Sequence, residues 1–247
     1  MNNLLQRYLD GDCIAVYQEI ENLNLANITA LERNEIEDVL AETFQRVSYN
    51  LNIIHTELKA LAYVFNSDAF SVMQEPLASP YPDTAKLLSE VQAQLQAFGY
   101  LPLSLHYFYR YVGGVDFSWD YNAQAIIWPL ADPIQVYALP DLLEIINNDE
   151  WLEEFAEIFD EEGISFLHLS SDVYHKDNIS GGFPYAIALT EKQSVDTKWL
   201  FESHETTFIN YLRICFAYGG FPGAAKLGAS ATFAAYLEKV KPQLKAI

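Results

Sequence analysis

A long apolar stripe, uninterrupted by Gly or Pro between residues 30 and 65, constrains the fold of this chain more than any other feature. Thr29 and Glu32 precede it with the spacing of a capping box, in which each side chain bonds the other residue's backbone at a helix start. Behind them the apolar residues recur at steps of three or four: Ile36, Leu40, Phe44, Val47, Leu51, Ile54, Leu58, Leu61 and Phe65. This spacing predicts one long helix with all of them on one face. We expect that face to be buried inside the chain, and the alternative is a seam between two copies.

A second, shorter helix is predicted over residues 4–23. Asp10-Gly11-Asp12 is its expected interruption, because these residues favour a turn or a helix cap. The two helices can pack against each other as an N-terminal helical hairpin. A connector rich in Pro and Ser follows over residues 66–84 and marks a soft boundary. We therefore divide the chain into a helical N-terminal extension (1–80) and a second domain (84–247).

The second domain mixes strands with helices. Gly99 and the Gly113-Gly114 pair are expected to end helices over residues 84–98 and 103–112. Further helices are predicted over 141–160, 206–218 and 231–237, and strands over 115–119, 125–128, 134–137, 164–169 and 185–189.

The composition indicates a compact globule in spite of a high charge. Apolar residues make up 51% of the chain and aromatic residues 14%, which is enough for a sizeable core. No apolar run approaches the roughly 18 residues of a membrane span, and the first residues lack the apolar core of a secretory signal. Cys13 and Cys215 are expected to be buried thiols, and a disulfide between them is the alternative. These features predict a cytoplasmic protein.

The charge is strongly asymmetric, with 34 Asp and Glu side chains against 14 Lys and Arg and a formal net charge of -20. Ten of the acids, and no Lys or Arg, lie within residues 141–162. Such a field repels nucleic acid and anionic membranes and attracts basic proteins. The residues predicted to bind a basic partner are Asp149, Glu150, Glu153, Glu154, Glu157, Asp160, Glu161 and Glu162. The alternative is a solvated helix face, on which like charges four residues apart cost on the order of a few tenths of a kcal/mol each.

No motif of a common enzyme class is present. The chain lacks G-x-S-x-G, G-x-G-x-x-G, G-x-x-x-x-G-K-[ST] and H-E-x-x-H, and its five His have no metal-ligand spacing. We therefore predict no catalytic residue, no metal and no cofactor. The Gly pairs are expected to form turns with positive φ.

An alternative function is a small-molecule-binding or enzymatic protein with a pocket beside Trp119 or Trp128. Its predicted ligand-binding residues are His175, Lys176, Asn178, Ser180, Gly181, Gly182 and Tyr185.

Several short motifs are more informative in their order than singly. Leu101-Pro102-Leu103-Ser104-Leu105 is followed by Phe108-Tyr109 and by Val112-Gly113-Gly114-Val115-Asp116-Phe117. Later pieces are Asp132-Pro133-Ile134-Gln135-Val136, the segment from His175 to Gly182 with Pro184-Tyr185, Thr207-Phe208, Tyr211-Leu212-Arg213 and Gly219-Gly220-Phe221-Pro222-Gly223. Over residues 85–225 this set resembles the SUKH superfamily (SMI1/KNR4-like domains), and in particular an uncharacterised bacterial branch with an N-terminal helical extension.

The resemblance implies the fold class α+β, a mainly antiparallel sheet flanked by helices, here with the N-terminal helical hairpin. It brings no catalytic residues. Many bacterial members of the superfamily are similar to immunity proteins that neutralise toxins, often nucleases, and others are regulatory interaction modules.

An acidic helix can occupy the basic cleft of a nuclease as a mimic of phosphates. We therefore predict a non-enzymatic protein-binding module, and more specifically a bacterial immunity protein that neutralises a basic, nuclease-like toxin through its acidic surface. A structural or regulatory subunit that oligomerises through the hairpin is a further alternative, and the oligomeric state is left open.

Overall fold

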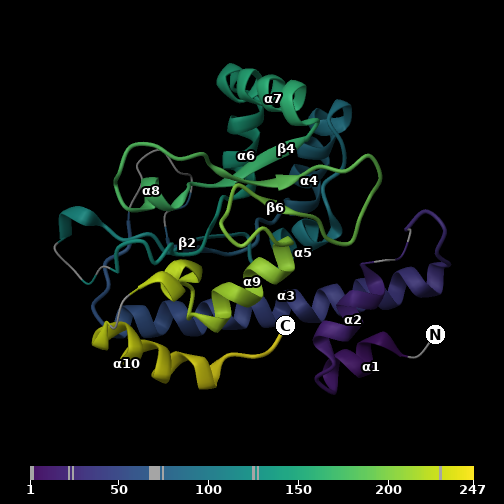
Figure 1. Cartoon of the computed structure of the whole chain (residues 1–247). Helices are drawn as coiled ribbons and strands as arrows, with labels where there is room; N and C mark the ends of the chain where they lie inside the picture. Colours follow the sequence, from purple (N-terminus) through teal and green to yellow (C-terminus); the bar gives the residue numbers. More distant parts are fainter. Residues whose placement is uncertain are drawn as a thin grey trace.

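The computed structural model describes residues 3–21, 23, 25–66, 73, 75–123, 126, 128–227 and 230–247, without the side chains of Asp160, Glu162 and Lys226. Its longest element is a helix, α3 (Ala30–Ala60), which runs across the molecule (Figure 1). The N-terminal helices and α10 lie on one side of α3, and the sheets with their helices lie on the other. The other helices are α1 (Leu4–Leu9), α2 (Cys13–Ile20), α4 (Thr84–Gln94), α5 (Leu103–Tyr111), α6 (Leu139–Ile146), α7 (Asp149–Glu162), α8 (Val173–Lys176), α9 (Phe208–Ala217) and α10 (Ala231–Val240).

The apolar stripe of α3 is buried within the chain, as the sequence predicts. Thr29 and Glu32 form the capping box, in which each side chain accepts the backbone N–H of the other. The stripe residues up to Leu58 are fully buried. Phe44 stacks on Phe208 of α9, and α5 packs along the same face. The chain therefore covers this stripe itself, and no seam between two copies is needed to bury it.

The helix ends at Ala60, earlier than the apolar spacing predicts. Ala62 takes a left-handed φ of 57°, and the N–H of Tyr63 bonds a carbonyl of the last turn, which closes the helix. The Tyr63 hydroxyl donates to the carbonyl of Phe117 at 2.5 Å. Phe65 packs on the ring of Phe117, with 5.6 Å between centroids. These tertiary contacts turn the chain toward the sheets although the helical spacing continues.

The N-terminal helices pack against α3 as predicted. They are separated at the expected turn, and α2 begins directly after Asp12. The Tyr17 hydroxyl of α2 donates to the Thr43 hydroxyl of α3 at 2.8 Å. Cys13 and Cys215 are buried free thiols, which confirms the prediction made for both.

The strands form two small antiparallel sheets in place of the one sheet predicted. The first has the order β1 (Leu77–Ala78), β2 (Gly114–Asp116), β3 (Gln135–Val136), and the second the order β4 (Phe166–Ser170), β5 (Tyr185–Ala188), β6 (Trp199–Leu200). β3 and β4 meet at their edges, where Tyr137 donates its N–H to the carbonyl of Leu169 at 2.8 Å. The Gln135 side chain also accepts the N–H of Ser171 at 2.7 Å. The predicted α+β class with antiparallel strands is confirmed.

Some predicted elements have other bounds in the structure. The prediction of one acidic helix over 141–160 is wrong, because the segment forms two helices, α6 and α7. Asn148 begins the second helix by accepting the N–H of Glu150 at 2.9 Å as its N-cap. The strand predicted over 115–119 ends with β2. The strand predicted over 125–128 falls mostly outside the described residues.

One cluster of buried apolar side chains extends from Leu4 to Ile247 and includes residues on both sides of the predicted boundary. A buried amide also ties the C-terminal tail to α3. Asn50 donates from Nδ2 to the carbonyl of Lys245 at 2.9 Å and accepts the N–H of Lys245 at 2.8 Å. Arg46 donates to the carbonyl of Ala246 at 3.0 Å. Helix α3 thus holds the N-terminal helices, the sheet-side helices and the tail together.

We expect Asn50→Ala to lower the free energy of unfolding by about 1–3 kcal/mol, because both backbone groups of Lys245 lose their partner. Asn52→Ala is the matched control, since Asn52 lies on the same helix and is exposed; we expect a change within about 0.5 kcal/mol. Urea denaturation followed by circular dichroism measures both. Equal effects of the two substitutions would show that the tail is not held by Asn50.

Candidate functional site

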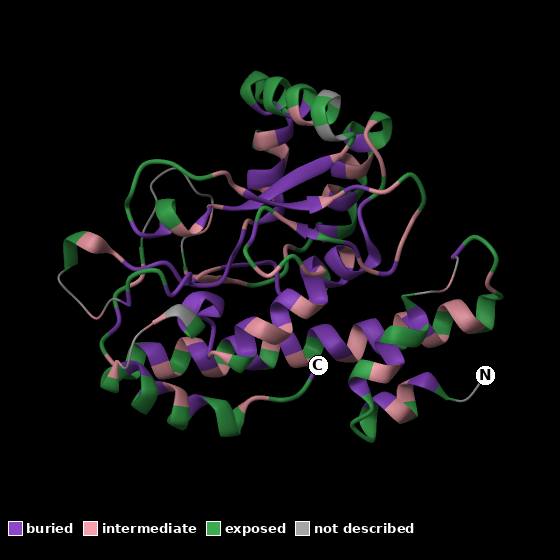
Figure 2. Cartoon of the chain, viewed as in Figure 1, coloured by how far each residue is buried: buried purple, intermediate pink, exposed green. Residues whose placement is uncertain are grey.

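Helix α7 carries the predicted partner-binding acids on the outside of the molecule (Figure 2). Six of these side chains are described and all six are exposed: Asp149, Glu150, Glu153, Glu154, Glu157 and Glu161. The side chains of Asp160 and Glu162 lie outside the described set. Within the described part of the chain, no Lys or Arg forms an ion pair with α7, and the nearest basic group is Nδ1 of His168, 3.9 Å from Glu154.

His168 does not neutralise this helix at neutral pH. Burial lowers the pKa of His168 to about 4, so its ring is uncharged at pH 7. Partial burial raises the pKa of Glu154, and the negative charges of Glu150 and Glu157 raise this pKa further. The like charges on α7 therefore remain uncompensated, and the apolar face of the helix must hold it in place.

Two aromatic side chains anchor α7 to the body of the molecule. Trp151 and Phe155 are buried, and their ring centroids lie 5.7 and 4.5 Å from that of Phe98. Leu152 and Phe159 lie two turns apart at the edge of this apolar face, where Phe159 stacks on Phe155, and they keep 40% and 46% of their surface exposed. A partner that approaches α7 therefore meets carboxylates together with exposed apolar side chains.

The segment predicted as an alternative ligand site begins with the single helical turn α8, which Asp172 caps. Asp172 is buried; one of its oxygens accepts the N–H of Tyr174 at 2.7 Å, and the other forms a short hydrogen bond with Nδ1 of His175. Gly182 has a φ of 97°, and a Cβ atom there would lie 2.1 Å from Oδ1 of Asp172, so only glycine fits. Gly181 also has a positive φ, which confirms the turn predicted from the Gly pair.

Lys176 and Tyr185 meet on a carboxylate that the sequence analysis missed. Lys176 Nζ bonds Oδ1 of Asp132 at 2.7 Å, and the Tyr185 hydroxyl donates to Oδ2 of Asp132 at 3.1 Å. The Lys176 side chain is fully buried, so it is a structural partner of Asp132 and cannot reach a ligand in solvent. Asp132 is 44 residues away from Lys176 in the sequence, and no local spacing could have revealed the pair.

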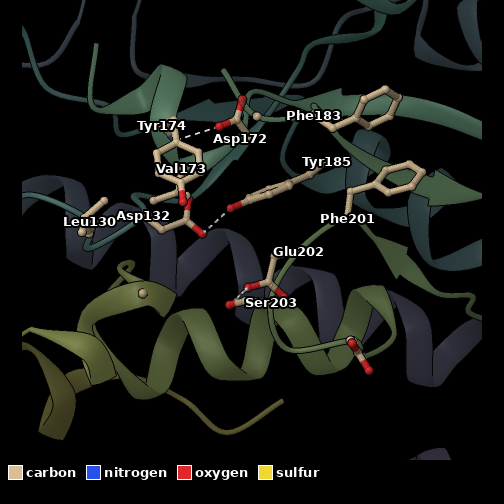
Figure 3. A pocket seen from close by; sticks show the side chains of 13 residues that line it. Leu130, Asp132, Asp172, Val173, Tyr174, Phe183, Tyr185, Phe201, Glu202 and Ser203 are labelled. Carbon is tan, nitrogen blue, oxygen red and sulfur yellow. Dashed lines mark hydrogen bonds between the residues drawn. The ribbon is translucent and has the colours of Figure 1, made fainter. Parts of the chain in front are cut away.

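A cavity of about 550 Å³, called the acidic cavity here, adjoins this segment (Figure 3). Its walls include Asp132, Asp172, Phe183, Tyr185, Phe201 and Glu202. Two of the predicted ligand-binding residues, Gly182 and Tyr185, line it. Glu202, which the sequence analysis also missed, is buried and bonds both the N–H and the ring of His204. Carboxylates and aromatic rings in one hollow suit a cationic group and disfavour an anion.

The other predicted ligand-binding residues lie elsewhere. A second cavity, of about 240 Å³, is lined by His175, Lys176 and Asn178 together with Trp119. Ser180 and Gly181 are exposed and line neither of these two cavities. Trp128 packs in a separate aromatic cluster with Phe221, Phe233 and Tyr236. The predicted set is thus divided between two hollows and the surface.

No family model, curated protein or solved structure matches this chain. The resemblance to the SUKH superfamily therefore stays a prediction. In the described ranges, no group of three or more His, Cys, Asp or Glu side chains is placed to hold a metal ion. Among the helices described, none has the length and apolarity needed to cross a membrane.

We expect Lys176→Met to lower the free energy of unfolding by about 3–5 kcal/mol, because it leaves the buried Asp132 carboxylate without its cation. The double variant Lys176→Met/Asp132→Asn removes both charges and should recover most of that loss. Lys86→Met is the control, since the Lys86–Glu90 pair is exposed and should contribute about 0.5 kcal/mol or less. Urea denaturation measures the free energy of unfolding of all three variants. Equal losses in Lys176→Met and Lys86→Met would refute a buried ion pair.

Proposed function

We propose that this chain is a non-enzymatic protein-binding module of the bacterial cytoplasm that binds a basic protein through α7. In its fuller form, the proposal is an immunity protein whose partner is a nuclease-like toxin. One observation carries it: the described carboxylates of α7 are exposed, and no described Lys or Arg pairs with them. The resemblance to SUKH domains supports the same conclusion from the sequence.

Uncompensated charge on one helix acts on a basic partner before the two proteins touch. A concentrated negative field steers positive surfaces toward α7 and raises the association rate. Contact with Lys or Arg of the partner then relieves the repulsion between carboxylates along the helix. Nucleases gather Lys and Arg in a cleft that binds phosphates, so a row of carboxylates can occupy that cleft. Leu152 and Phe159 would add apolar burial to these charge contacts.

The same field disfavours negatively charged partners. Nucleic acid and anionic membrane surfaces would be repelled by α7 and by the net charge of -20. The proposal therefore includes neither nucleic acid nor a membrane as a partner, and it assigns no catalytic residue, metal or cofactor.

A second candidate function is small-molecule binding or catalysis at the acidic cavity. The specific observation in its favour is that Gly182 and Tyr185 of the predicted segment line a hollow of about 550 Å³. Ligand sites commonly have volumes of roughly 300–1,000 Å³. This candidate does not need α7, so changes on α7 separate the two functions.

Charge reversal on α7 tests the proposal. We expect the triple variant Glu153→Lys/Glu154→Lys/Glu157→Lys to associate about tenfold more slowly with the basic partner, with a weaker salt dependence, because steering is lost. The partner assayed is the protein encoded beside this chain in its genome. Stopped-flow Trp fluorescence measures the association rate over a range of salt concentrations.

The matched control changes the net charge equally at exposed sites away from α7: Asp38→Lys/Glu191→Lys/Glu238→Lys. We expect only a small decrease in rate for this variant. Equal slowing by the two triple variants, or no slowing by the α7 variant, would overturn the assignment of the surface. Failure of the unchanged chain to bind the neighbouring protein would contradict the proposed partner.

A further inference from the structure

We infer that the acidic cavity is the binding site for an arginine side chain of the basic partner. This inference rests on the proposed function, because α7 is the surface that attracts that partner. The ligand chemistry is a planar guanidinium on a short apolar stem. The cavity volume of about 550 Å³ leaves room for such a side chain with its adjoining peptide.

The walls of the acidic cavity carry an excess of negative groups. Asp132, Asp172 and Glu202 line it together with the exposed Glu205, and no Lys or Arg is among the lining residues that the structure describes. Lys176 compensates Asp132 alone, through the buried ion pair. Asp172 and Glu202 are bonded to histidine rings and not to Lys or Arg. A cation that enters the cavity therefore meets the exposed Glu205 directly and the three buried carboxylates through their charge.

Glu205 is the carboxylate that an entering guanidinium can reach, because its side chain is exposed and lines the cavity. The several N–H groups of a guanidinium are well matched to such an acceptor. The Glu202 side chain is fully buried, so it cannot contact a ligand and acts on one only through its charge. Its oxygens accept the His204 N–H at 2.8 Å, a short bond from the His204 ring and the Ser203 hydroxyl at 3.5 Å, which hold it within its own loop.

Aromatic rings supply the second half of the site. Phe183 and Phe201 meet edge-on with 4.6 Å between centroids, and Figure 3 shows both beside Tyr185. The Tyr185 ring already has a cation near it, because Lys176 Nζ lies 4.7 Å from its centroid. Phe201 is 38% exposed and is therefore accessible to an entering group. A planar guanidinium packs favourably on such rings, whereas a strongly hydrated inorganic cation does not gain in the same way.

The acidic cavity and α7 share one aromatic cluster. Phe166 lies 5.5 Å from Phe155 of α7 and 5.6 Å from Phe201 of the cavity, measured between ring centroids. Two ring contacts therefore connect α7 with the cavity wall, and we take both α7 and the cavity to belong to one interface with the partner. A buried arginine there would act mainly on the dissociation rate, whereas the exposed carboxylates of α7 would act on the association rate.

Two small probes test the cavity without the partner. N-acetyl-arginine amide and N-acetyl-citrulline amide differ in that citrulline has a neutral urea in place of the guanidinium. We expect the arginine probe to bind with a Kd on the order of 1 mM, and the citrulline probe at least about tenfold more weakly. Two-dimensional NMR titration measures both and locates the shifts at residues 201–205. Equal binding of the probes, or no binding of either, overturns this inference and leaves the proposal for α7 standing.

Variants of the cavity connect the probe to named residues. Glu202→Gln should weaken the arginine probe about threefold, because a negative charge behind the cavity wall is removed. Because Glu202 also supports its loop, two milder variants are tested beside it. Glu205→Gln changes the exposed carboxylate. Phe201→Asn removes the ring, and Asn tolerates the left-handed φ of 65° that Phe201 adopts. Each should weaken the probe about threefold. Glu191→Gln is the control, because Glu191 is exposed and does not line the cavity. Full affinity in all three cavity variants overturns the inference.

Dissociation of the complex with the partner tests whether the guanidinium belongs to the partner or to a free small molecule. Phe201→Asn should speed dissociation of the complex about tenfold and leave the association rate unchanged, which is the opposite of the α7 triple variant. Suppose that Phe201→Asn leaves the dissociation rate of the complex unchanged although the unchanged chain binds the arginine probe. The cavity would then bind a free organic cation, and the assignment to the partner would be overturned. If the α7 triple variant has no effect while the probe binds, the proposed function fails and the cation site remains.

Discussion

The burial of α3 along its length is the constraint on which the rest of the structure depends. Its apolar stripe is fully buried up to Leu58 and meets the rings of α5 and α9, while Thr43 and Asn50 bind α2 and the C-terminal tail. A helix in the middle of a core fixes the position of every element packed on it. The two short sheets have few hydrogen bonds between them and derive their placement largely from these helices.

A core organised in this way leaves the charge at its periphery. Helix α7 is attached through Trp151 and Phe155, and its described carboxylates have no Lys or Arg within ion-pair distance. The negative charge therefore reduces the stability of a peripheral helix and leaves the centre of the fold unaffected. Phe166 contacts both Phe155 of this helix and Phe201 of the acidic cavity, so one aromatic cluster connects the helix with the cavity wall.

Local signals in the sequence predicted local structure. The capping box of Thr29 with Glu32 and the turn at residues 10–12 are confirmed, because neighbouring residues determine them. The α+β class, which the resemblance to SUKH domains implied, is also confirmed. Contacts between distant residues could not be predicted in this way. The Tyr63 bond to Phe117, 54 residues away, ends α3 before the apolar spacing does. The pairing of Asp132 with Lys176 likewise made a predicted ligand residue a buried structural one.

Native-state hydrogen exchange at increasing salt concentration is the most direct test of the difference between α3, which is buried in the core, and α7, whose carboxylates repel one another. We expect the α3 amides from Ile36 to Leu58 to exchange only through global unfolding, with little response to salt. The α7 amides should exchange through a local opening of much lower free energy and gain protection as salt screens the carboxylates. Protection of α7 equal to that of α3 at low salt, without a response to added salt, would contradict the account.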